Sequence, residues 1–152
     1  MTPEQWGPPV WTLFHTLAQR INDDKFAQFG PQLIGFISRI CRYLPCPTCS
    51  EHATAFLAKV KPNGMRTKND LVNVLYIMHN VVNKRKNKQM YLPDVMDQYN
   101  TKNIIQVYNN FAAVYQTKGN MRLLTDTFQR QLIIKDFKRW VTSNIAIFFS
   151  NA

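Results

Sequence analysis

Two cysteines separated by two residues, Cys46 and Cys49, are the residues of this chain best suited to chemistry. Proline is favoured at the first position of an α-helix, so Pro47 predicts a helix that begins there, with Cys46 as its N-cap residue. Side chains three positions apart on a helix are neighbours, which brings the two sulfur atoms within reach of a disulfide bond. The positive end of the helix dipole favours the thiolate of Cys46. The pair can therefore cycle between dithiol and disulfide.

The same Cys-x-x-Cys spacing also serves zinc sites, so the pair alone does not choose between redox chemistry and metal binding. A zinc-binding module could draw four ligands from Cys41, Cys46, Cys49 and His52. Against it, Cys41 lies on the preceding predicted helix, and no second Cys or His pair has the spacing of a zinc finger. With only three cysteines the fold is not held by a disulfide framework, and we expect Cys41 to be a buried core thiol.

The charge of the chain is strongly positive but evenly distributed. Its 152 residues suffice for one domain with a real core and carry a formal net charge of +10. Residues 1–99 have 12 basic and 7 acidic side chains, and residues 100–152 have 7 and 2. This spread predicts general attraction to anions and no specific nucleic-acid partner. The alternative, a basic nucleic-acid-binding protein, predicts only salt-sensitive, sequence-independent binding.

No segment of the sequence looks like a membrane span or a leader. The N-terminus lacks the basic-then-apolar pattern of a signal peptide, and no apolar run is long enough to cross a bilayer. The nearest approach, Ile145 to Phe149, is far too short. We therefore expect neither a signal peptide nor a transmembrane segment.

Helical spacing of apolar residues dominates the chain, and strand patterns are nearly absent. We expect a first helix that opens at Pro8-Pro9 and a second over residues 26–44, with Gly30-Pro31 as a candidate break. The third should begin at Pro47 and end at Pro62-Asn63-Gly64.

A fourth helix is expected after Thr67, which can form a capping box with Asp70. Two more are expected over roughly residues 101–117 and 126–149, with Gly119-Asn120 between them. The predicted fold is all-α: a four-helix bundle with the Cys-x-x-Cys at the start of the third helix, plus a C-terminal helical extension. This context argues against a thioredoxin-like site, which requires a β-α-β unit.

Three patches of chemically useful residues follow one another along these helices. The first runs from Trp6-Gly7 to Trp11 and His15, and the last two share a helix face because they are four residues apart. The second is the cysteine pair, with His52 one turn beyond Cys49. The third is His79-Asn80-Val81-Val82-Asn83, followed by Lys84-Arg85-Lys86-Asn87-Lys88. His79, Asn83 and Lys86 lie on one stripe of the fourth helix.

These patches resemble the Erv/ALR family of FAD-linked sulfhydryl oxidases. The family pattern is W-G-x-x-x-W-x-x-x-H, then C-x-x-C, then H-N-x-V-N-x-x-x-x-K, and this sequence matches every defined position over about residues 4–99. The form Leu-Pro-Cys-x-x-Cys-x-x-His-Ala is most similar to the short oxidases of large cytoplasmic DNA viruses. The resemblance implies an oxidase domain over residues 1–99 and leaves residues 100–152 as an extension of unknown role.

By this resemblance, FAD would be bound by residues of all three patches: Trp6, Gly7, Trp11, His15, Cys49, His52, His79, Asn80, Val82, Asn83, Lys84, Lys86 and Lys88. Aromatic and imidazole rings suit the walls of a flat flavin slot, and amides can satisfy its polar atoms. The lysines suit the pyrophosphate, whereas Arg85 is expected to be free. His52 could equally face solvent, and Tyr91 and Tyr99 could stack near the adenine or simply pack.

The resemblance also implies a mechanism, with Cys46 facing the substrate and Cys49 against the flavin. A substrate thiolate would attack Cys46, and Cys49 would then pass two electrons to FAD, from which O2 takes them to give H2O2. The chain has no second cysteine pair to act as a shuttle. The partner is therefore expected to be a thiol-containing protein substrate or a separate thioredoxin-like redox protein.

Assembly and location are further expectations from the resemblance. Family members commonly dimerise through helical faces, and the first two helices are apolar enough to form a homodimer. A viral protein of this kind would act in the host cytoplasm or the virion, in a viral disulfide-forming pathway that serves assembly.

Overall fold

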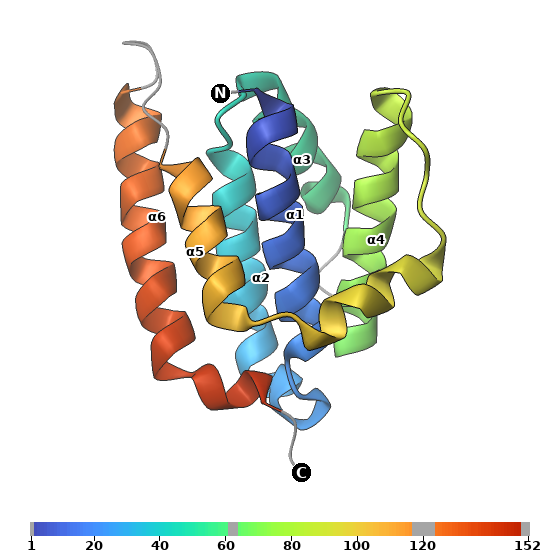
Figure 1. The fold of residues 1–152 in the computed structure, drawn as a ribbon, viewed down its shortest axis with the longest axis vertical. Coiled ribbons are helices and arrows are strands. Elements are labelled where there is room, and N and C mark those ends of the chain that lie inside the picture. Colours follow the sequence, from blue (N-terminus) through green and yellow to red (C-terminus); the bar gives the residue numbers. More distant parts are fainter. Residues whose placement is uncertain (1, 61–63, 117–123, 150–152) are drawn as a thin grey trace.

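The computed structural model describes residues 2–60, 64–116 and 124–149, and within these ranges it contains helices and no strands (Figure 1). The described α-helices are α1 (Pro3–Arg20), α2 (Phe26–Arg42), α3 (Pro47–Lys59), α4 (Lys68–Arg85), α5 (Ile104–Tyr115) and α6 (Leu124–Ser143). Short 3-10 helices join or follow them: η1 (Asp23–Lys25), η3 (Pro93–Thr101) and η5 (Ile145–Phe148). The predicted all-α fold is confirmed. None of the described helices combines the length and the apolar character that a membrane span requires.

The first helix begins earlier than predicted, at Pro3 and not at Pro8-Pro9. The backbone N–H of Thr2 donates to Oε1 of Gln5 at 2.8 Å, and Pro3 occupies the first helical position, where a missing N–H is harmless. Pro8-Pro9 therefore lies inside α1. The carbonyls four residues before the two prolines lose their intrahelical partner, but they belong to exposed residues in the first turn, where water can reach them.

Gly30-Pro31 does not break α2, which is continuous from Phe26 to Arg42. The glycine makes room for a neighbouring ring: a Cβ at position 30 would lie 2.7 Å from Cε1 of Phe26. The helix start predicted at Pro47 is confirmed. The expected turn residues Pro62-Asn63 and Gly119-Asn120 lie outside the described residues.

The capping box predicted for α4 is confirmed. Thr67 Oγ1 accepts from the N–H of Asp70 at 3.1 Å, and the carboxylate of Asp70 accepts from the N–H of Thr67 at 3.1 Å. The two C-terminal helices are shorter than predicted. α5 begins at Ile104 because Asn103 caps it, with its Oδ1 accepting from the N–H of Gln106 at 2.9 Å. After Ser143 the chain continues as the 3-10 helix η5.

The helices that carry the predicted functional residues pack on different partners. α1 and α2 are central, α3 packs mainly on α2, and α4 packs mainly on α1 and η3 (Figure 1). α3 and α4 are therefore held mainly by different helices.

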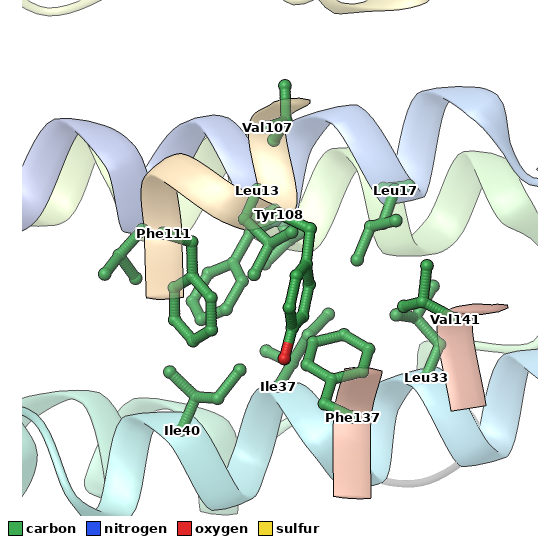
Figure 2. Close-up of a cluster of buried hydrophobic side chains, with 14 of the residues drawn as sticks. Leu13, Leu17, Leu33, Ile37, Ile40, Val107, Tyr108, Phe111, Phe137 and Val141 are labelled. Carbon is green, nitrogen blue, oxygen red and sulfur yellow. The ribbon is translucent and has the colours of Figure 1, made fainter. Parts of the chain in front are cut away.

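On the other side of the central pair, α5 packs along α1 and α6 along α2 (Figure 1). The core that they share (Figure 2) includes side chains of four helices: Leu13, Leu17, Leu33, Ile37, Ile40, Val107, Tyr108, Phe111, Phe137 and Val141. Phe137 stacks on Phe36 of α2 with 4.5 Å between ring centroids. The C-terminal helices are thus part of the hydrophobic core, and they cover apolar surface of α1 and α2 that could otherwise have served a dimer.

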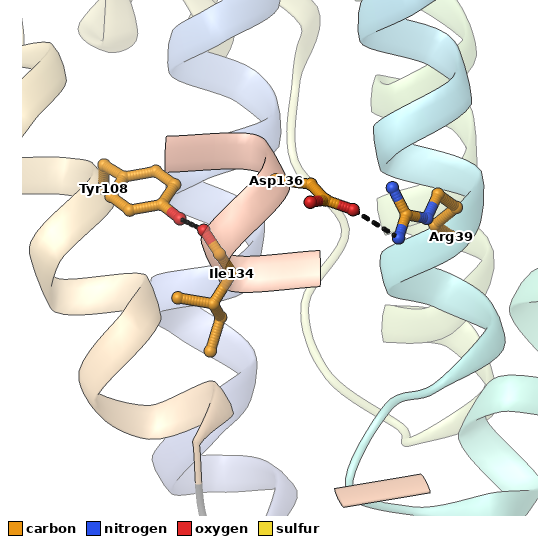
Figure 3. A network of polar contacts seen from close by, with 4 residues as sticks. All are labelled: Arg39, Tyr108, Ile134 and Asp136. Carbon is orange, nitrogen blue, oxygen red and sulfur yellow. Dashed lines mark hydrogen bonds and ion pairs between the residues drawn. The ribbon is translucent and has the colours of Figure 1, made fainter. Parts of the chain in front are cut away.

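Polar contacts fix the position of α6 on the bundle. The hydroxyl of Tyr108 donates to the carbonyl of Ile134 at 2.5 Å, and the guanidinium of Arg39 contacts the carboxylate of Asp136 at 3.2 Å (Figure 3). The indole N–H of Trp140 donates to Oε1 of Gln32 at 2.6 Å. The Arg39–Asp136 pair is half exposed, so it contributes at most about 1 kcal/mol. Burial of the apolar side chains of α6 therefore stabilises its position more than this ion pair does.

Two phenylalanine-to-alanine substitutions in α6 test this packing. Phe137→Ala removes a side chain that is 0% exposed, and we expect it to lower the free energy of unfolding by about 3–5 kcal/mol. Phe128→Ala is the matched control on the same helix, because Phe128 is 58% exposed and its loss should change stability by no more than about 0.5 kcal/mol. Chemical denaturation of both variants measures the difference. Equal effects would show that α6 does not join the core.

Candidate functional site

Cys46 and Cys49 form a disulfide at the N-terminus of α3. Their Cα atoms are 5.2 Å apart, a separation that a disulfide requires. Cys46 is the N-cap residue, and its Sγ accepts from the backbone N–H of Cys49 at 3.2 Å. This contact gives a partner to one of the free N–H groups at the helix start. The predicted cap and the predicted pairing are both present.

The turn before α3 is held by a serine. Ser50 Oγ accepts from the N–H of Leu44 at 2.8 Å, which ties the residues before Cys46 to the first turn of the helix. Leu44 is buried, whereas both cysteines are partly exposed. The disulfide is therefore presented at the surface by an anchored backbone.

A cavity of about 240 Å³ lies in the slot between α3 and α4, and the disulfide forms part of its wall. α1 contributes Trp6 and Trp11, and α4 contributes Met78 and Val82. Most of the lining is apolar, and its cationic members are Arg85 and Lys86 at the end of α4. This cavity, which we name the disulfide cavity, can take a flat apolar group beside a redox-active bond.

A second cavity of about 160 Å³, the strap cavity, is lined by His79, Asn83, Lys88 and two tyrosines, Tyr91 and Tyr99. Five residues line both cavities, namely Pro3, Gly7, Trp11, Val82 and Lys86. The two cavities are therefore neighbouring parts of one groove along α1 and α4.

Stacked rings line part of the groove: Trp11 lines both cavities, and His79 and Tyr99 line the strap cavity. Trp11 stacks on His79 with 4.1 Å between centroids and an interplanar angle of 4°, and it also stacks on His15 at 5.6 Å. Nε2 of His15 and Nδ1 of His79 are 2.9 Å apart, so one imidazole donates a hydrogen bond to the other. Tyr99 completes the stack, 4.9 Å from His15.

Burial keeps both imidazoles neutral. Desolvation lowers the pKa of His15 from its ordinary 6.5 to about 3, with a further contribution from His79. Desolvation likewise lowers the pKa of His79 to about 4, with the positive charge of Lys88 as a second cause. A neutral, flat and nearly parallel stack is suited to contact an aromatic ligand.

Two buried N–H donors in the groove have no hydrogen-bond partner among the described residues. Nε1 of Trp6, in the disulfide cavity, and Nδ2 of Asn83, in the strap cavity, belong to side chains that are 5% and 4% exposed. A buried donor left unpaired costs about 1–3 kcal/mol. A ligand that carries acceptors at both places would remove this cost, and the cations at Lys86 and Lys88 suit an anionic group between them.

The structure brings most of the predicted site residues into this groove. The disulfide cavity contains Trp6, Gly7, Trp11, Cys46, Cys49, His52, Val82 and Lys86, and the strap cavity adds His79, Asn83 and Lys88. His15 lines neither cavity and is hydrogen-bonded to His79. Asn80 and Lys84 line neither cavity. The amide of Asn80 is bonded to the backbone of Tyr91 instead, and Lys84 is exposed.

Sequence reasoning missed several residues of the groove. Arg85, expected to be free, lines the disulfide cavity, as do Phe56 and Met78. Helical spacing could have placed two of them, because Met78, Val82 and Arg85 follow one another at intervals of four and three residues.

Cys41 also lines the disulfide cavity, but its thiol is unreactive. Burial raises the pKa of its thiol to about 12, so the nucleophilic thiolate is scarce. The zinc alternative needed Cys41, Cys46, Cys49 and His52 in one cluster. The sulfur atoms of Cys46 and Cys49 are bonded to each other. Among the described residues, no group of three or more His, Cys, Asp or Glu is arranged so that it could hold a metal ion.

Comparison with known proteins finds a matching family and several similar proteins named as sulfhydryl oxidases. A sequence model of the Erv1/Alr family matches residues 8–103, which end directly before α5. An FAD-linked sulfhydryl oxidase of African swine fever virus (isolate Tick/Malawi/Lil 20-1/1983) is 32% identical over 85 residues, 56% of this chain and 71% of the viral protein. A probable FAD-linked sulfhydryl oxidase of Variola virus is 30% identical over 96 residues, 62% of this chain and 94% of its own length. FAD-linked sulfhydryl oxidase ERV1 of Oryza sativa subsp. japonica is 30% identical over 91 residues, 60% of this chain and 46% of the plant protein. No solved structure matches the chain.

The buried imidazoles predict a specific pH dependence of stability. In the unfolded chain they take up protons as the pH falls below about 6.5, whereas in the folded chain they stay neutral to about pH 4 and about pH 3. Because the unfolded state binds more protons in this window, the free energy of unfolding falls as the pH is lowered from about 6.5 to about 4. Above about 6.5 these two groups contribute no slope.

The double variant His15→Gln/His79→Gln checks this, because glutamine keeps polar atoms but does not titrate. Its melting temperature should depend less steeply on pH between about 4 and 6.5 than that of the wild type. Identical slopes for the two proteins would show that the imidazoles are not held neutral.

Proposed function

This chain belongs to the Erv1/Alr family, and on that premise we propose that it is an FAD-linked sulfhydryl oxidase that forms disulfide bonds in thiol substrates. The observation that carries the proposal is the position of the Cys46–Cys49 disulfide. It lies in the wall of a groove that also offers stacked rings, two unpaired buried donors and cationic side chains. The names of the similar proteins support both the activity and the cofactor.

The groove fits FAD in its chemistry. The flat rings of Trp11 and His79 and the apolar lining around Met78 suit the ring systems of the cofactor. The free N–H groups of Trp6 and Asn83 can donate to its acceptors. We propose that Cys49, His52, Val82 and Gly7 contact it through the disulfide cavity, and that Lys86, Lys88 and also Arg85 neutralise its phosphates. When bound, FAD supplies a two-electron acceptor that O2 can reoxidise with formation of H2O2.

Thiol–disulfide exchange at the N-terminus of α3 supplies the electrons. A substrate thiolate attacks Sγ of Cys46, which breaks the Cys46–Cys49 bond, forms a mixed disulfide and leaves Cys49 as a thiolate. A second substrate thiolate attacks the substrate sulfur of that mixed disulfide, so the substrate disulfide forms and Cys46 leaves as a thiolate. Two substrate thiols thereby lose two protons and two electrons, and the electrons reside on the reduced cysteine pair. The helix dipole and the N–H of Cys49 stabilise the thiolate of Cys46.

The substrate must reach Cys46 from outside, because the chain has no further cysteine pair to relay electrons. We propose a thiol-containing protein or a separate thioredoxin-like protein as the reducing partner and O2 as the acceptor. Viral proteins among the relatives support a role in a viral disulfide-forming pathway, in the host cytoplasm or the virion, during assembly.

A homodimer remains part of the proposal, but by a different surface from the one expected. The apolar faces of α1 and α2 are used by α5 and α6 of the same chain. Exposed apolar side chains remain on α4, where Ile77 and Val81 are 52% and 38% exposed, one turn apart. Val81 also lines the disulfide cavity, so we propose the face of α4 around Ile77 for self-association.

Serine variants of the three cysteines test the catalytic assignment. Cys46→Ser and Cys49→Ser should each abolish oxygen uptake with a small dithiol, because neither variant can form the exchanging disulfide. Cys41→Ser is the control and should keep most of the activity, since its thiol is buried and protonated. An oxygen electrode, with flavin content determined for each variant, measures the outcome. Full turnover by either of the first two variants would remove the mechanism.

A further inference from the structure

The segment after α4, residues 86–91, forms a strap that reverses the direction of the chain. Asn87 adopts the left-handed conformation with φ of 57°, which asparagine tolerates better than most residues. The N–H of Lys88 donates to the carbonyl of Asn83 at 2.7 Å, and the N–H of Asn87 donates to that of Lys84 at 3.2 Å. These two bonds form a Schellman motif, which anchors the first end of the strap to the last turn of α4.

The second end of the strap is anchored by the side chain of Asn80. The N–H of Tyr91 donates to Oδ1 of Asn80 at 2.8 Å, and Nδ2 of Asn80 donates to the carbonyl of Tyr91 at 3.0 Å. The hydroxyl of Tyr76 donates to the same carbonyl at 2.8 Å. One amide thus holds both backbone groups of one residue, as a neighbouring strand would, and a second side chain reinforces it.

Few other contacts could hold the strap. Met90, within the strap, and Leu92, directly after it, are 52% and 70% exposed, so burial of these apolar side chains does not anchor the strap. Asn80, by contrast, is 6% exposed, and its hydrogen bonds to Tyr91 are partly buried. The clamp that Asn80 forms on Tyr91 is therefore the two-bond anchor at this end of the strap, beside the Tyr76 hydroxyl and the ring contact with His79.

The strap carries three residues of the groove. Lys86, Lys88 and Tyr91 line the strap cavity. The ring of Tyr91 meets His79 edge-on at 4.9 Å between centroids, and Lys88 is close enough to lower the pKa of His79. Release of Tyr91 would therefore move one wall and one cation of the strap cavity, whereas the α3 side of the disulfide cavity has no residue in the strap.

We propose that Asn80 is a positioning residue that holds the strap closed over the part of the groove away from the disulfide. It acts through Tyr91 and Lys88 and does not contact the cofactor. This replaces the expectation that the Asn80 amide satisfies polar atoms of the flavin. The proposal rests on the proposed function only in naming FAD as the ligand; the clamp itself is a property of the chain.

Three variants and one control separate the clamp from other roles. Asn80→Ala removes both side-chain bonds to Tyr91, and Asn80→Asp keeps the acceptor but sets an oxygen against the Tyr91 carbonyl. Tyr76→Phe removes only the reinforcing bond at an exposed hydroxyl, so we expect it to fold normally, which circular dichroism verifies for each variant. Asn73→Ala is the matched control, an exposed asparagine on the same helix.

Two measurements on the purified 152-residue chain report independently on the opening of the strap and on the retention of the cofactor. The first is the rate of trypsin cleavage after Lys86 and Lys88, followed by mass spectrometry. The second is the rate of FAD release on dilution, followed by flavin fluorescence. Asn80→Ala and Asn80→Asp should raise both rates by about tenfold or more, Tyr76→Phe by less, and Asn73→Ala by neither.

Each other outcome contradicts the proposal in a recognisable way. Unchanged cleavage and unchanged FAD release would show that Asn80 holds nothing. Faster cleavage with unchanged FAD release would show that the strap does not retain the cofactor. Faster FAD release without faster cleavage would show that Asn80 contacts FAD directly. A protein without flavin would overturn the proposed function, and the cleavage rates would still decide whether the clamp exists.

Discussion

The two helices that carry the chemistry pack on different partner helices, and the rest of the structure depends on this arrangement. α3, with the disulfide at its start, packs on α2, whereas α4, with the imidazole and the cations, packs on α1 (Figure 1). The slot between them can stay open because each helix obtains its stabilising contacts elsewhere. A bundle in which α3 and α4 packed on each other would bury the disulfide against Val82 and leave no room for a ligand.

That arrangement requires a rigid central pair, and the C-terminal helices help to provide it. α5 and α6 add Phe111 and Phe137 (Figure 2) as well as Tyr115, all 0% exposed, to the core of α1 and α2. The hydroxyl of Tyr115 donates to the carbonyl of Ile40 at 3.1 Å, only a few residues before the disulfide turn. Residues beyond the family match therefore support the helix that leads into the redox site, although none of those that the structure describes lines either part of the groove.

Features set by neighbouring residues can be predicted from the sequence, and features set by distant residues cannot. The N-cap at Cys46 and the capping box of Thr67 depend on three or four residues each, and the sequence predicts both. Pro8-Pro9 is a misleading sign of a helix start because the stronger pair, Thr2 and Pro3, lies before it. The role of Asn80 escapes prediction since its partner is the backbone of Tyr91, eleven residues later, in a segment without helical spacing. Whether the apolar stripes of α5 and α6 face the bundle or another protomer depends on tertiary packing, which periodicity alone does not decide.

We propose above all that the groove along α1 and α4 holds a flavin beside the Cys46–Cys49 disulfide of α3. The visible absorption spectrum of the purified full-length protein tests it most directly, together with the amount of FAD released on denaturation. We predict a protein-bound flavin spectrum and the release of one FAD per chain, with loss of the visible absorption when a dithiol is added without oxygen. A colourless protein that releases no FAD, and that binds none when FAD is supplied, would contradict the account.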